Sequence, residues 1–455
     1  MKTQLKNCSF RDPSGFVFVR DGEVFRQINR SYQPHFDLLI ESGLYSSLLK
    51  NGKIVSHEET AELFDENSRG YKVIRHEKIP FISYPYEWCF SQFRDAALLT
   101  LDIEMRALKK GMCLKDASAY NVQFIGSKPV FIDTLSFEKY TEGEPWIAYK
   151  QFCQHFLAPL VLMKYHSVSC AKMAAIFLDG IDLGIASSML PFSTKLSFSL
   201  LAHIHLHAGF QKKYSEKPLS DKKISLNSRL ALIDSLKCLV TKMDRKIPRT
   251  QWGSYYTDIH YSDEALNHKK QIVESFVKRI TPQTVFDLGG NAGVFSRIAS
   301  KFASYTVSTD LDPEAVELNY TQASEEKERT LLPLVIDLAN PSPAIGWQNS
   351  ERSSFVQRGP ADMIMALALV HHLVISNNCT FNMVAEFFAS LCRFAIVEFI
   401  PYDDKQIKLM LSTRKDIAHE YNQDVFESAF GEYFTTLEVC PLHDSGRKLY
   451  LFKKR

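Results

Sequence analysis

The sequence lacks the features that would place it at once in several common classes of protein. Its nine cysteines include no C-x-x-C pair, so the usual signature of a zinc ribbon or a redox dithiol is missing. No run of about 20 residues is free of charge, and the opening residues MKTQLKNCSFRD have no apolar core of the kind that a signal peptide carries. We therefore expect no membrane segment, reduced thiols and a cytoplasmic location.

An excess of charge of one sign is also missing. The 54 lysines and arginines nearly balance the 52 aspartates and glutamates, so the net charge of +2 gives no electrostatic indication of nucleic-acid binding. The most apolar region, Met173 to Phe210, is interrupted by charged side chains and by Pro191, and we interpret it as buried core. A chain of 455 residues exceeds one ordinary hydrophobic core, which predicts at least two domains.

The first half of the chain has the signals of a mixed α+β domain. Residues 14–28, SGFVFVRDGEVFRQI, alternate in polarity around Asp21-Gly22 and predict a β-hairpin. Residues 90–110 keep apolar side chains at helical spacing, and residues 122–133 predict a second hairpin. Strands and helices are therefore both expected before the middle of the chain.

The second half alternates more regularly. Apolar strand candidates separated by helical segments occur at 284–288, 305–310, 331–337, 362–367 and 394–400. Continuous apolar strands joined by helices predict an α/β fold, a Rossmann-like doubly wound parallel sheet covered on both faces. The closing runs 434–440 and 447–454 predict a hairpin that adds one antiparallel strand.

A polar, lysine-rich stretch separates the two halves. Residues 211–228 are interrupted by proline and have the composition of a flexible linker. We therefore predict an N-terminal domain over 1–215, a linker with a helical connection over 216–264, and a second domain over 265–455.

Residues 285–296, VFDLGGNAGVFS, place a glycine-rich turn between the first strand and a helix. Such a turn brings backbone N–H groups close to a ligand. The dinucleotide pattern G-x-G-x-x-G does not fit, because from Gly289 it meets Asn291 and Val294. A simple strand-to-helix turn is the structural alternative.

Aspartates end the first three strands of this half. Asp287, Asp310 and Asp337 would lie together, because ligands of a doubly wound sheet bind beyond the carboxyl ends of its strands. An acid directly before the glycine turn would repel a pyrophosphate but would accept a ligand with a cationic end. Asp337 could instead cap the segment that follows it.

These residues resemble the motifs of class I S-adenosylmethionine-dependent methyltransferases. DLGGNAG is similar to their first motif, with Asn291 in place of the usual middle glycine, and asparagine tolerates the left-handed backbone that a turn demands. STDLDPEAVELN, VIDLAN and ADMIMALALVHHL resemble the next three motifs in order. The resemblance covers about residues 265–455, and in finer detail it extends to methyltransferase-like proteins grouped with a rhizobial nodulation protein.

The resemblance implies S-adenosyl-L-methionine as the cofactor. From the spacing of the cysteines and histidines we expect no metal site. The resemblance also implies that Asp310 accepts hydrogen bonds from the ribose and that Asp337 lies near the adenine. The implied cofactor-binding residues are Asp287, Gly289, Gly290, Asn291, Gly293, Asp310, Leu311, Asp337, Leu338 and Ala366.

Three residues are candidates for removing a proton from the methyl acceptor: His371, His372 and Glu398. A structural role is at least as compatible with each of them, and of the two histidines we favour His372 as the structural one. ALALVHH does not match the motif of the amino-group methylases of nucleic acid bases, so we expect an unidentified small-molecule or saccharide-like acceptor. Aromatic residues before the domain, Tyr255, Tyr256, His260 and Tyr261, could line its pocket.

The N-terminal half resembles protein-kinase-like phosphotransferases over residues 113–137. The resemblance implies Asp116 as a base and Asn121 and Asp133 as magnesium ligands, although no glycine-rich phosphate loop is evident. The alternatives to a methyltransferase are therefore a kinase-like or bifunctional enzyme and a binding protein that keeps the cofactor fold without catalysis. His203, His205 and His207 do not complete a metal ligand set.

Overall fold

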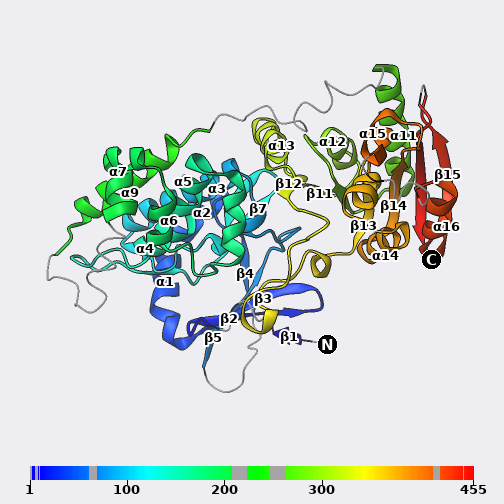
Figure 1. The fold of residues 1–455 in the computed structure, drawn as a ribbon. Coiled ribbons are helices and arrows are strands. Elements are labelled where there is room, and N and C mark those ends of the chain that lie inside the picture. The colour runs from blue at the N-terminus through cyan, green and yellow to red at the C-terminus, as the bar shows by residue number, and fades with distance from the viewer. Residues whose placement is uncertain are drawn as a thin grey trace. The chain divides into compact units, whose positions relative to one another are not determined.

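The computed structural model describes residues 3–5, 9, 11–60, 69–206, 223–245, 263–412, 414, 421–443 and 445–455. The chain divides into two compact units (Figure 1). The first consists of Met1–Ile125, Pro129–Lys246 and Ala344–Arg352, and the second of Gly126–Lys128, Ile247–Pro343 and Ser353–Arg455. Helix α9 (Leu226–Thr241), which the sequence placed in the connecting segment, belongs to the first unit.

An antiparallel sheet opens the first unit. Its strands, in spatial order, are β1 (Thr3–Leu5), β2 (Gly15–Arg20), β3 (Glu23–Asn29), β5 (Gly70–His76) and β4 (His57–Thr60). The predicted hairpin between β2 and β3 is confirmed. Asp21 and Gly22 both have positive φ values, 51° and 84°, as a two-residue turn between twisted strands requires.

Helices make up most of the rest of the first unit. They are α1 (Gln33–Glu41), α2 (Leu44–Lys50), α3 (Phe90–Leu108), α4 (Tyr149–Phe152), α5 (Ala158–Tyr165), α6 (Leu183–Met189), α7 (Phe198–Leu200) and α9. Two short pairs of strands follow α3: β6 (Met112–Leu114) with β9 (Phe137–Lys139), and β7 (Val122–Ile125) with β8 (Lys128–Phe131). The predicted helix over 90–110 and the predicted hairpin over 122–133 are thereby confirmed.

The interpretation of Met173 to Phe210 as buried core is wrong for part of its length. Leu183, Leu200 and Ile204 are buried, but Phe192 and Phe198 are 72% and 84% exposed. The composition of a segment shows how apolar it is but not which of its side chains are buried. Here short 3₁₀ and π segments turn some of the apolar side chains outward. Residues 207–210 lie outside the described part of the chain.

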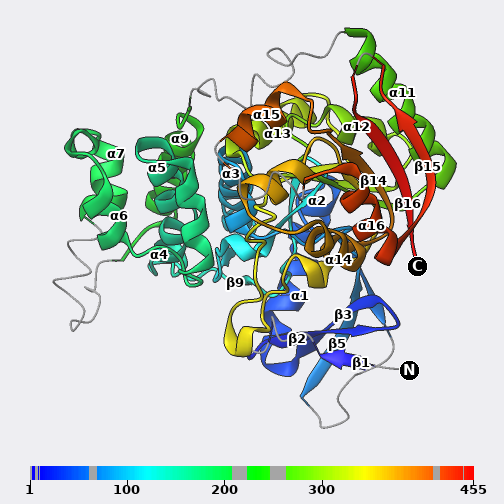
Figure 2. The same ribbon diagram turned by 45° about the vertical axis from the view of Figure 1, so that its right-hand side comes forward.

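A seven-stranded sheet forms the second unit. Its spatial order is β12 (Leu331–Val335), β11 (Tyr305–Asp310), β10 (Thr284–Leu288), β13 (Ala361–Ala366), β14 (Cys392–Phe399), β16 (Lys448–Lys454) and β15 (Phe434–Pro441). The first five strands are parallel, and β16 pairs antiparallel with both β14 and β15 at the end of the sheet (Figure 2). The predicted doubly wound sheet with a closing antiparallel hairpin is confirmed.

Helices cover this sheet on two faces, as its apolar strands require. They are α11 (Asp263–Ile280), α12 (Val294–Ser300), α13 (Pro313–Glu325), α14 (Phe381–Leu391), α15 (Lys405–Ser412) and α16 (Gln423–Tyr433). Val273 and Phe276 of α11 pack with Leu451 of β16 on one face. On the other face Phe426 of α16 lies 5.1 Å from the Tyr450 ring. Alternating side chains of one strand therefore serve both layers.

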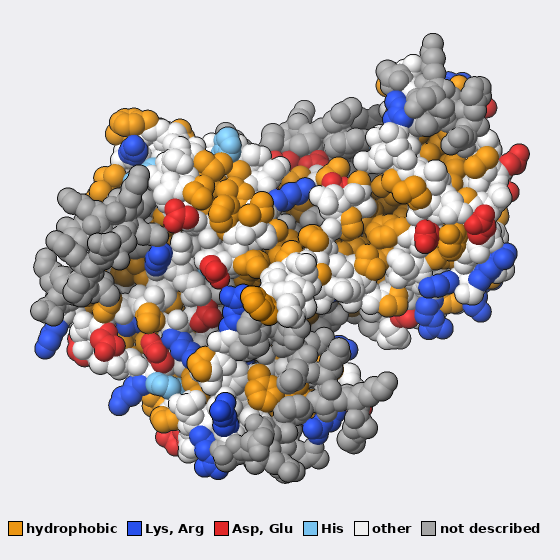
Figure 3. Space-filling view, turned by 60° about the horizontal axis from the view of Figure 1, so that its bottom comes forward, with side chains coloured by type: hydrophobic (Ala, Val, Ile, Leu, Met, Phe, Trp, Pro, Cys, Tyr) orange, Lys and Arg blue, Asp and Glu red, His pale blue; other side chains and the backbone are white. Residues whose placement is uncertain are grey.

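The balance of acidic and basic residues in the sequence is visible on the surface. Acidic and basic side chains are interspersed on the face that Figure 3 shows, with apolar side chains between them. Within the described residues, none of the helices combines the length and the apolar character needed to cross a bilayer.

Candidate functional site

The glycine turn between β10 and α12 has the backbone geometry that its residues permit. Gly293 has a φ of 81°, and a Cβ atom there would stand 2.2 Å from Oδ1 of Asn319, so only glycine fits without displacement. Asn291 has a φ of 49°, which is the left-handed region that asparagine tolerates. The substitution of asparagine for the usual middle glycine is therefore compatible with the turn.

Asp287 is the next-to-last residue of β10, and its side chain lies in a chain of hydrogen bonds. The Ser296 hydroxyl donates to its Oδ2 at 2.5 Å and lies 2.9 Å from the Ser308 hydroxyl, which also accepts from the Asn319 amide at 3.1 Å. The residue is only 1% exposed, and burial raises the pKa of its carboxyl group to about 7 despite the Ser296 bond and nearby Lys269. Near neutral pH this group is therefore poised between its neutral and its charged form.

Asp310 is the last residue of β11, the strand beside β10, and its side chain bonds to the backbone of the glycine turn. Its Oδ2 accepts from the backbone N–H of Asn291 at 2.8 Å, and its Oδ1 accepts from that of Asp312 at 2.8 Å. Burial raises its pKa to about 6, although both backbone bonds oppose the shift. Because each carboxylate oxygen can accept more than one hydrogen bond, both can still serve a ligand.

A cavity of about 570 Å³ lies at the carboxyl ends of these strands. Of the predicted cofactor-binding residues, those that line it are Asp287, Gly289, Gly290, Asn291, Asp310, Leu311, Asp337 and Leu338. Gly293 and Ala366 are not among the lining residues; Gly293 shapes the turn, and Ala366 ends β13. Asp337 accepts from the backbone N–H of Ala339 at 2.9 Å, so it caps a turn rather than an α-helix.

Sequence reasoning missed other residues of this cavity. Lys269, Phe295, Leu369 and Asn377 line it as well. The fold brings them in from α11, from α12 and from the segment after β13. The one signal in the sequence is weak: Lys269 interrupts the apolar face of an amphipathic helix that precedes the first strand.

The two histidines after β13 take different positions. His371 is 4% exposed and its Nδ1 has no hydrogen-bond partner, whereas His372 begins the short π-helix η11 (His372–Ser376) and lines the cavity. Burial lowers the pKa of His372, and that of His371 still further. The structure thus places His372 and not His371 at the cavity, opposite to the preference from the sequence, because the pair lies in helical backbone and not at the end of an extended strand.

Glu398 does not lie at the cavity as an accessible carboxylate. The Glu398 side chain forms a buried ion pair with Lys269, in which Oε2 lies 2.6 Å from Nζ. Nη1 of Arg447 lies 3.7 Å from the other carboxylate oxygen, Oε1. Arg447 in turn pairs with Asp404 at 2.8 Å. Glu398 is absent from the cavity lining, so this geometry favours a supporting role over proton removal.

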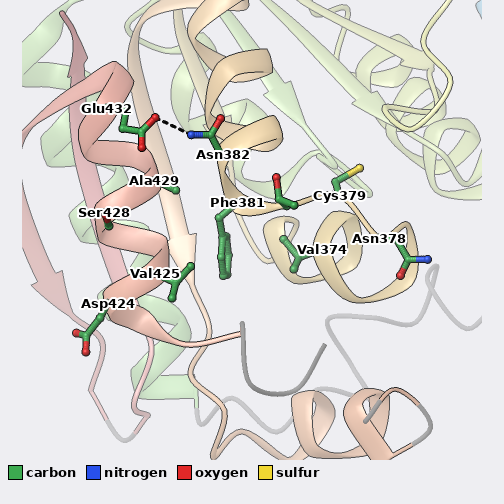
Figure 4. A pocket seen from close by; sticks show the side chains of 11 residues that line it. Val374, Asn378, Cys379, Phe381, Asn382, Asp424, Val425, Ser428, Ala429 and Glu432 are labelled. Carbon is green, nitrogen blue, oxygen red and sulfur yellow. Dashed lines mark hydrogen bonds between the residues drawn. The ribbon is translucent and has the colours of Figure 1, made fainter. Parts of the chain in front are cut away.

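A second cavity of about 450 Å³ lies between the start of α14, the segment that precedes it and the face of α16 that runs from Asp424 to Glu432 (Figure 4). Phe381 and Val425 contribute apolar surface, and the Asn382 amide donates to Glu432 at 2.7 Å. Asp424 is the other acid that lines it. Lysine and arginine are absent from its described lining, so its chemistry disfavours an anionic ligand.

In the first unit, the three residues of the kinase-like pattern lie near one another. The Ser136 hydroxyl donates to Asp133 at 2.6 Å and accepts from the Asn121 amide at 3.1 Å. Burial and the charge of Asp133 raise the pKa of Asp116. Asp133, however, also forms an ion pair with Arg26 of β3, so a protein cation already occupies one side of the carboxylate.

Two of the histidines considered as metal ligands form hydrogen bonds to other side chains. His203 bonds to the Tyr149 hydroxyl at 2.7 Å, and His205 bonds to Ser187 and Thr194 at 2.8 and 2.9 Å. His207 lies outside the described residues, as do Tyr255, Tyr256, His260 and Tyr261. In the described ranges, groups of three or more histidine, cysteine or acidic side chains suited to a metal do not occur.

The order of the strands and the position of the cavity together define the class I S-adenosylmethionine-dependent methyltransferase fold in the second unit. No protein-family profile matches the sequence. Nodulation protein NoeA of Rhizobium meliloti (strain 1021) is 32% identical over 456 residues, covering 98% of this chain and 95% of the relative. The chain therefore belongs to the same family as NoeA.

Solved structures with a similar fold include two methyltransferases. Magnesium protoporphyrin IX methyltransferase from Synechocystis PCC 6803, with bound S-adenosylhomocysteine, is 17% identical, with 45% of this chain and 93% of that chain covered and a TM-score of 0.33. N-methyltransferase NodS from Bradyrhizobium japonicum WM9, in complex with the same compound, is 10% identical, with 44% and 91% covered and a TM-score of 0.33.

Proposed function

We propose that the protein is a methyltransferase that uses S-adenosyl-L-methionine. The observation that carries the proposal is the convergence of Asp287, Asp310 and Asp337 on one cavity beside a glycine turn. Carboxylates gathered around one cavity suit a ligand rich in hydrogen-bond donors and positive charge, and they disfavour a dinucleotide with its pyrophosphate. The cofactor meets this requirement with its ammonium, sulfonium, ribose hydroxyls and adenine amino group.

Each part of the cavity has a role in this proposal. Asp310 would accept hydrogen bonds from the ribose hydroxyls, and Asp337 would lie near the adenine. Leu311 is 57% exposed although it lines the cavity, so an adenine ring would cover apolar surface that is otherwise left to water. Asp287 would face the ammonium group of the amino-acid end. When bound, the cofactor supplies an electrophilic methyl group.

The proposed acceptor is a small molecule or a saccharide-like compound, and we propose His372 as its base. A hydroxyl acceptor must lose a proton during methyl transfer, and a neutral imidazole can receive it. His372 lines the cavity, and burial lowers its pKa, so the ring is neutral at physiological pH. Glu398, the other candidate, is engaged by Lys269 and does not line the cavity.

For the first unit we propose binding rather than phosphate transfer. Asp116, Asn121 and Asp133 lie close enough for a kinase-like layout, but Arg26 pairs with Asp133 where magnesium would need an open carboxylate. The full-length protein should show no magnesium-dependent ATP turnover in a phosphate-release assay. Turnover that disappears in Asp133→Asn would refute this proposal and establish the unit as a phosphotransferase.

Calorimetry with S-adenosylhomocysteine, the demethylated cofactor, tests the methyltransferase proposal. The compound should bind the full-length protein and NAD should not. Asp310→Ala removes the ribose acceptor and should weaken binding by about 1.5 to 3 kcal/mol, the usual contribution of hydrogen bonds to a charged group. Glu386→Gln, at an exposed acid on α14, is the control. Binding of NAD alone would show that the cofactor is misassigned.

Catalysis needs a separate measurement, because a binding protein could keep the same cavity. Purified protein would be incubated with isotopically labelled cofactor and a cell extract, and the products analysed by mass spectrometry. A labelled small molecule that His372→Ala does not produce would support the enzyme. Tight binding of S-adenosylhomocysteine without any labelled product would favour the non-catalytic alternative.

A further inference from the structure

We infer that Lys269 binds the carboxylate of the cofactor's amino-acid end, and that Glu398 and Arg447 position Lys269 for this task. The inference rests on the proposed function and adds a residue to its site. It also gives Glu398 a role other than that of a base.

Lys269 lies where the cavity meets the interior of the second unit. It lines the cavity together with Asp287 and Phe295, yet the residue is only 3% exposed. Its Nζ lies 2.6 Å from Oε2 of Glu398 and 4.8 Å from the centre of the Phe295 ring. The ammonium is therefore held between a carboxylate behind it and an aromatic face beside the cavity.

The acidic side chains that line the cavity favour a cation at the place where a ligand carboxylate would lie. Asp287, Asp310, Asp312 and Asp337 all line it, whereas the described lining contains Lys269 as its one lysine or arginine. The amino-acid end of the cofactor is a zwitterion, so its carboxylate would be repelled by these acids without a nearby positive charge. Asp287 matches the ammonium half of that zwitterion, and Lys269 matches the carboxylate half.

A group of buried ion pairs explains how the positive charge of Lys269 is stabilised inside the protein. Removing a single charge from water is costly unless it is paired. Glu398 pairs with Lys269, Arg447 lies 3.7 Å from Glu398, and Asp404 pairs with Arg447 at 2.8 Å. Two cations and two carboxylates thus alternate and balance. An ammonium group has three donors, so a bond to Glu398 is compatible with a further acceptor on the cavity side.

Truncated ligands test the assignment without any need for the methyl acceptor. Calorimetry would compare S-adenosylhomocysteine with its decarboxylated analogue, S-adenosyl-3-thiopropylamine, which keeps the ammonium group. Lys269→Met should weaken binding of S-adenosylhomocysteine by about 10- to 100-fold, as expected for a charged hydrogen bond, and leave the analogue within about threefold. Lys269→Arg should restore part of the loss, because it keeps the charge.

A matched control lies on the same helix. Lys278 of α11 is an exposed lysine that pairs with Glu274 at 2.7 Å, so Lys278→Met removes an ion pair away from the cavity and should change neither affinity. Thermal unfolding would establish that each variant is folded. Equal weakening of both ligands by Lys269→Met would mean a structural role and overturn the inference, as would an unchanged affinity for S-adenosylhomocysteine.

Glu398→Gln separates positioning from proton removal. If Glu398 positions Lys269, this variant should weaken S-adenosylhomocysteine several-fold and spare the decarboxylated analogue. If Glu398 is a base, affinity for both ligands should stay unchanged while turnover falls, which would contradict the positioning role. Failure of the wild-type protein to bind either ligand would contradict the proposed function itself, and is thereby distinguished from failure of this inference.

Discussion

At the scale of single residues, the site is defined by carboxyl groups that the fold removes from water. Asp287 and Asp310 both have raised pKa values, to about 7 and about 6, and burial is the largest cause for each. A carboxyl group that is costly to ionise in buried surroundings becomes easier to ionise when a cation or hydroxyl donors lie beside it. Binding and ionisation are therefore coupled at these two positions.

This coupling predicts a pH dependence of cofactor binding. An ammonium group binds the ionised form of Asp287, and ionisation increases as the pH rises toward its pKa of about 7. Affinity for S-adenosylhomocysteine should therefore increase steeply from about pH 5.5 to about 7, and by no more than about twofold between about 7 and 8, where ionisation of Asp287 becomes complete. Calorimetry in buffers of different ionisation enthalpy should detect release of a proton on binding below pH 7.

Asp287→Asn provides the control for this prediction. The amide cannot ionise, so the upper part of the pH dependence should disappear, and only the part due to Asp310, near pH 6, should remain. A wild-type affinity that stays constant from pH 5.5 to 8 would separate Asp287 from the ammonium group. Asparagine is close to aspartate in size and can still accept from Ser296, so the fold should be retained.

His372 and His371 should respond differently to replacement. Because burial lowers the pKa of His372, turnover should be constant near neutral pH and fall only below about 6.5, where the imidazole begins to accept a proton. His372→Ala should reduce turnover by about 100- to 10,000-fold, the usual share of a positioned base. Rates measured with labelled cofactor across this pH range test both statements.

His371→Ala is the matched variant, because His371 is buried and does not line the cavity. It should lower the thermal unfolding temperature, leave the pH profile in place and permit turnover at reduced temperature. If His371→Ala abolishes turnover in a folded protein while His372→Ala does not, the assignment favoured here is wrong.

At the scale of elements, the site depends on a turn whose backbone is set by neighbouring side chains. Gly293 is directly followed by α12, and Asn319 of α13 lies against it. Asp310 at the end of β11 bonds to the backbone of Asn291. The turn is therefore fixed by an adjacent strand and by a second helix, and not by its own sequence alone.

Gly293→Ala should destabilise the second unit by about 1 to 3 kcal/mol, because alanine would adopt a left-handed backbone and its Cβ would stand 2.2 Å from Asn319. Gly431→Ala is the control: this glycine lies within α16, and a Cβ atom there meets nothing within 4 Å. It should stabilise the helix by about 0.5 to 1 kcal/mol. Urea unfolding measures both changes, and equal effects of the two variants would contradict the strain at Gly293.

At the scale of the whole molecule, the chain combines two units of different architecture. The first joins an antiparallel sheet to helices, and the second is a doubly wound sheet whose residues line the whole candidate cavity. All residues that we assign to the cofactor come from the second unit. The structure thus locates the proposed chemistry in one unit.

This division predicts that the cofactor product stabilises one unit selectively. At about 100 times its Kd, S-adenosylhomocysteine should add about 2.7 kcal/mol to the free energy of unfolding of the second unit and nothing to that of the first. Hydrogen exchange should therefore slow in β10 and β11 and stay unchanged in β2 and β3. Asp310→Ala should require more ligand for the same protection, and equal protection of both units would contradict the division.

The sequence by itself determined the local features of the protein. The predicted strand over 284–288 and the predicted strand over 305–310 match β10 and β11 residue for residue, because continuous apolar runs between turn residues have few other uses. These two strands also predicted that Asp287 and Asp310 lie close together, since the carboxyl ends of parallel strands meet at one edge of the sheet. The hairpin around Asp21-Gly22 was equally local.

Only the tertiary structure decided which side chains from distant parts of the chain meet. Lys269 and Glu398 pair across 129 positions, and no pattern in the sequence relates them. His371 and His372 are adjacent and identical in type, so only packing could bury the first and place the second at the cavity. Local periodicity fixes elements, whereas burial and long-range charge pairing arise when the elements pack, and those two effects decide which polar groups can react.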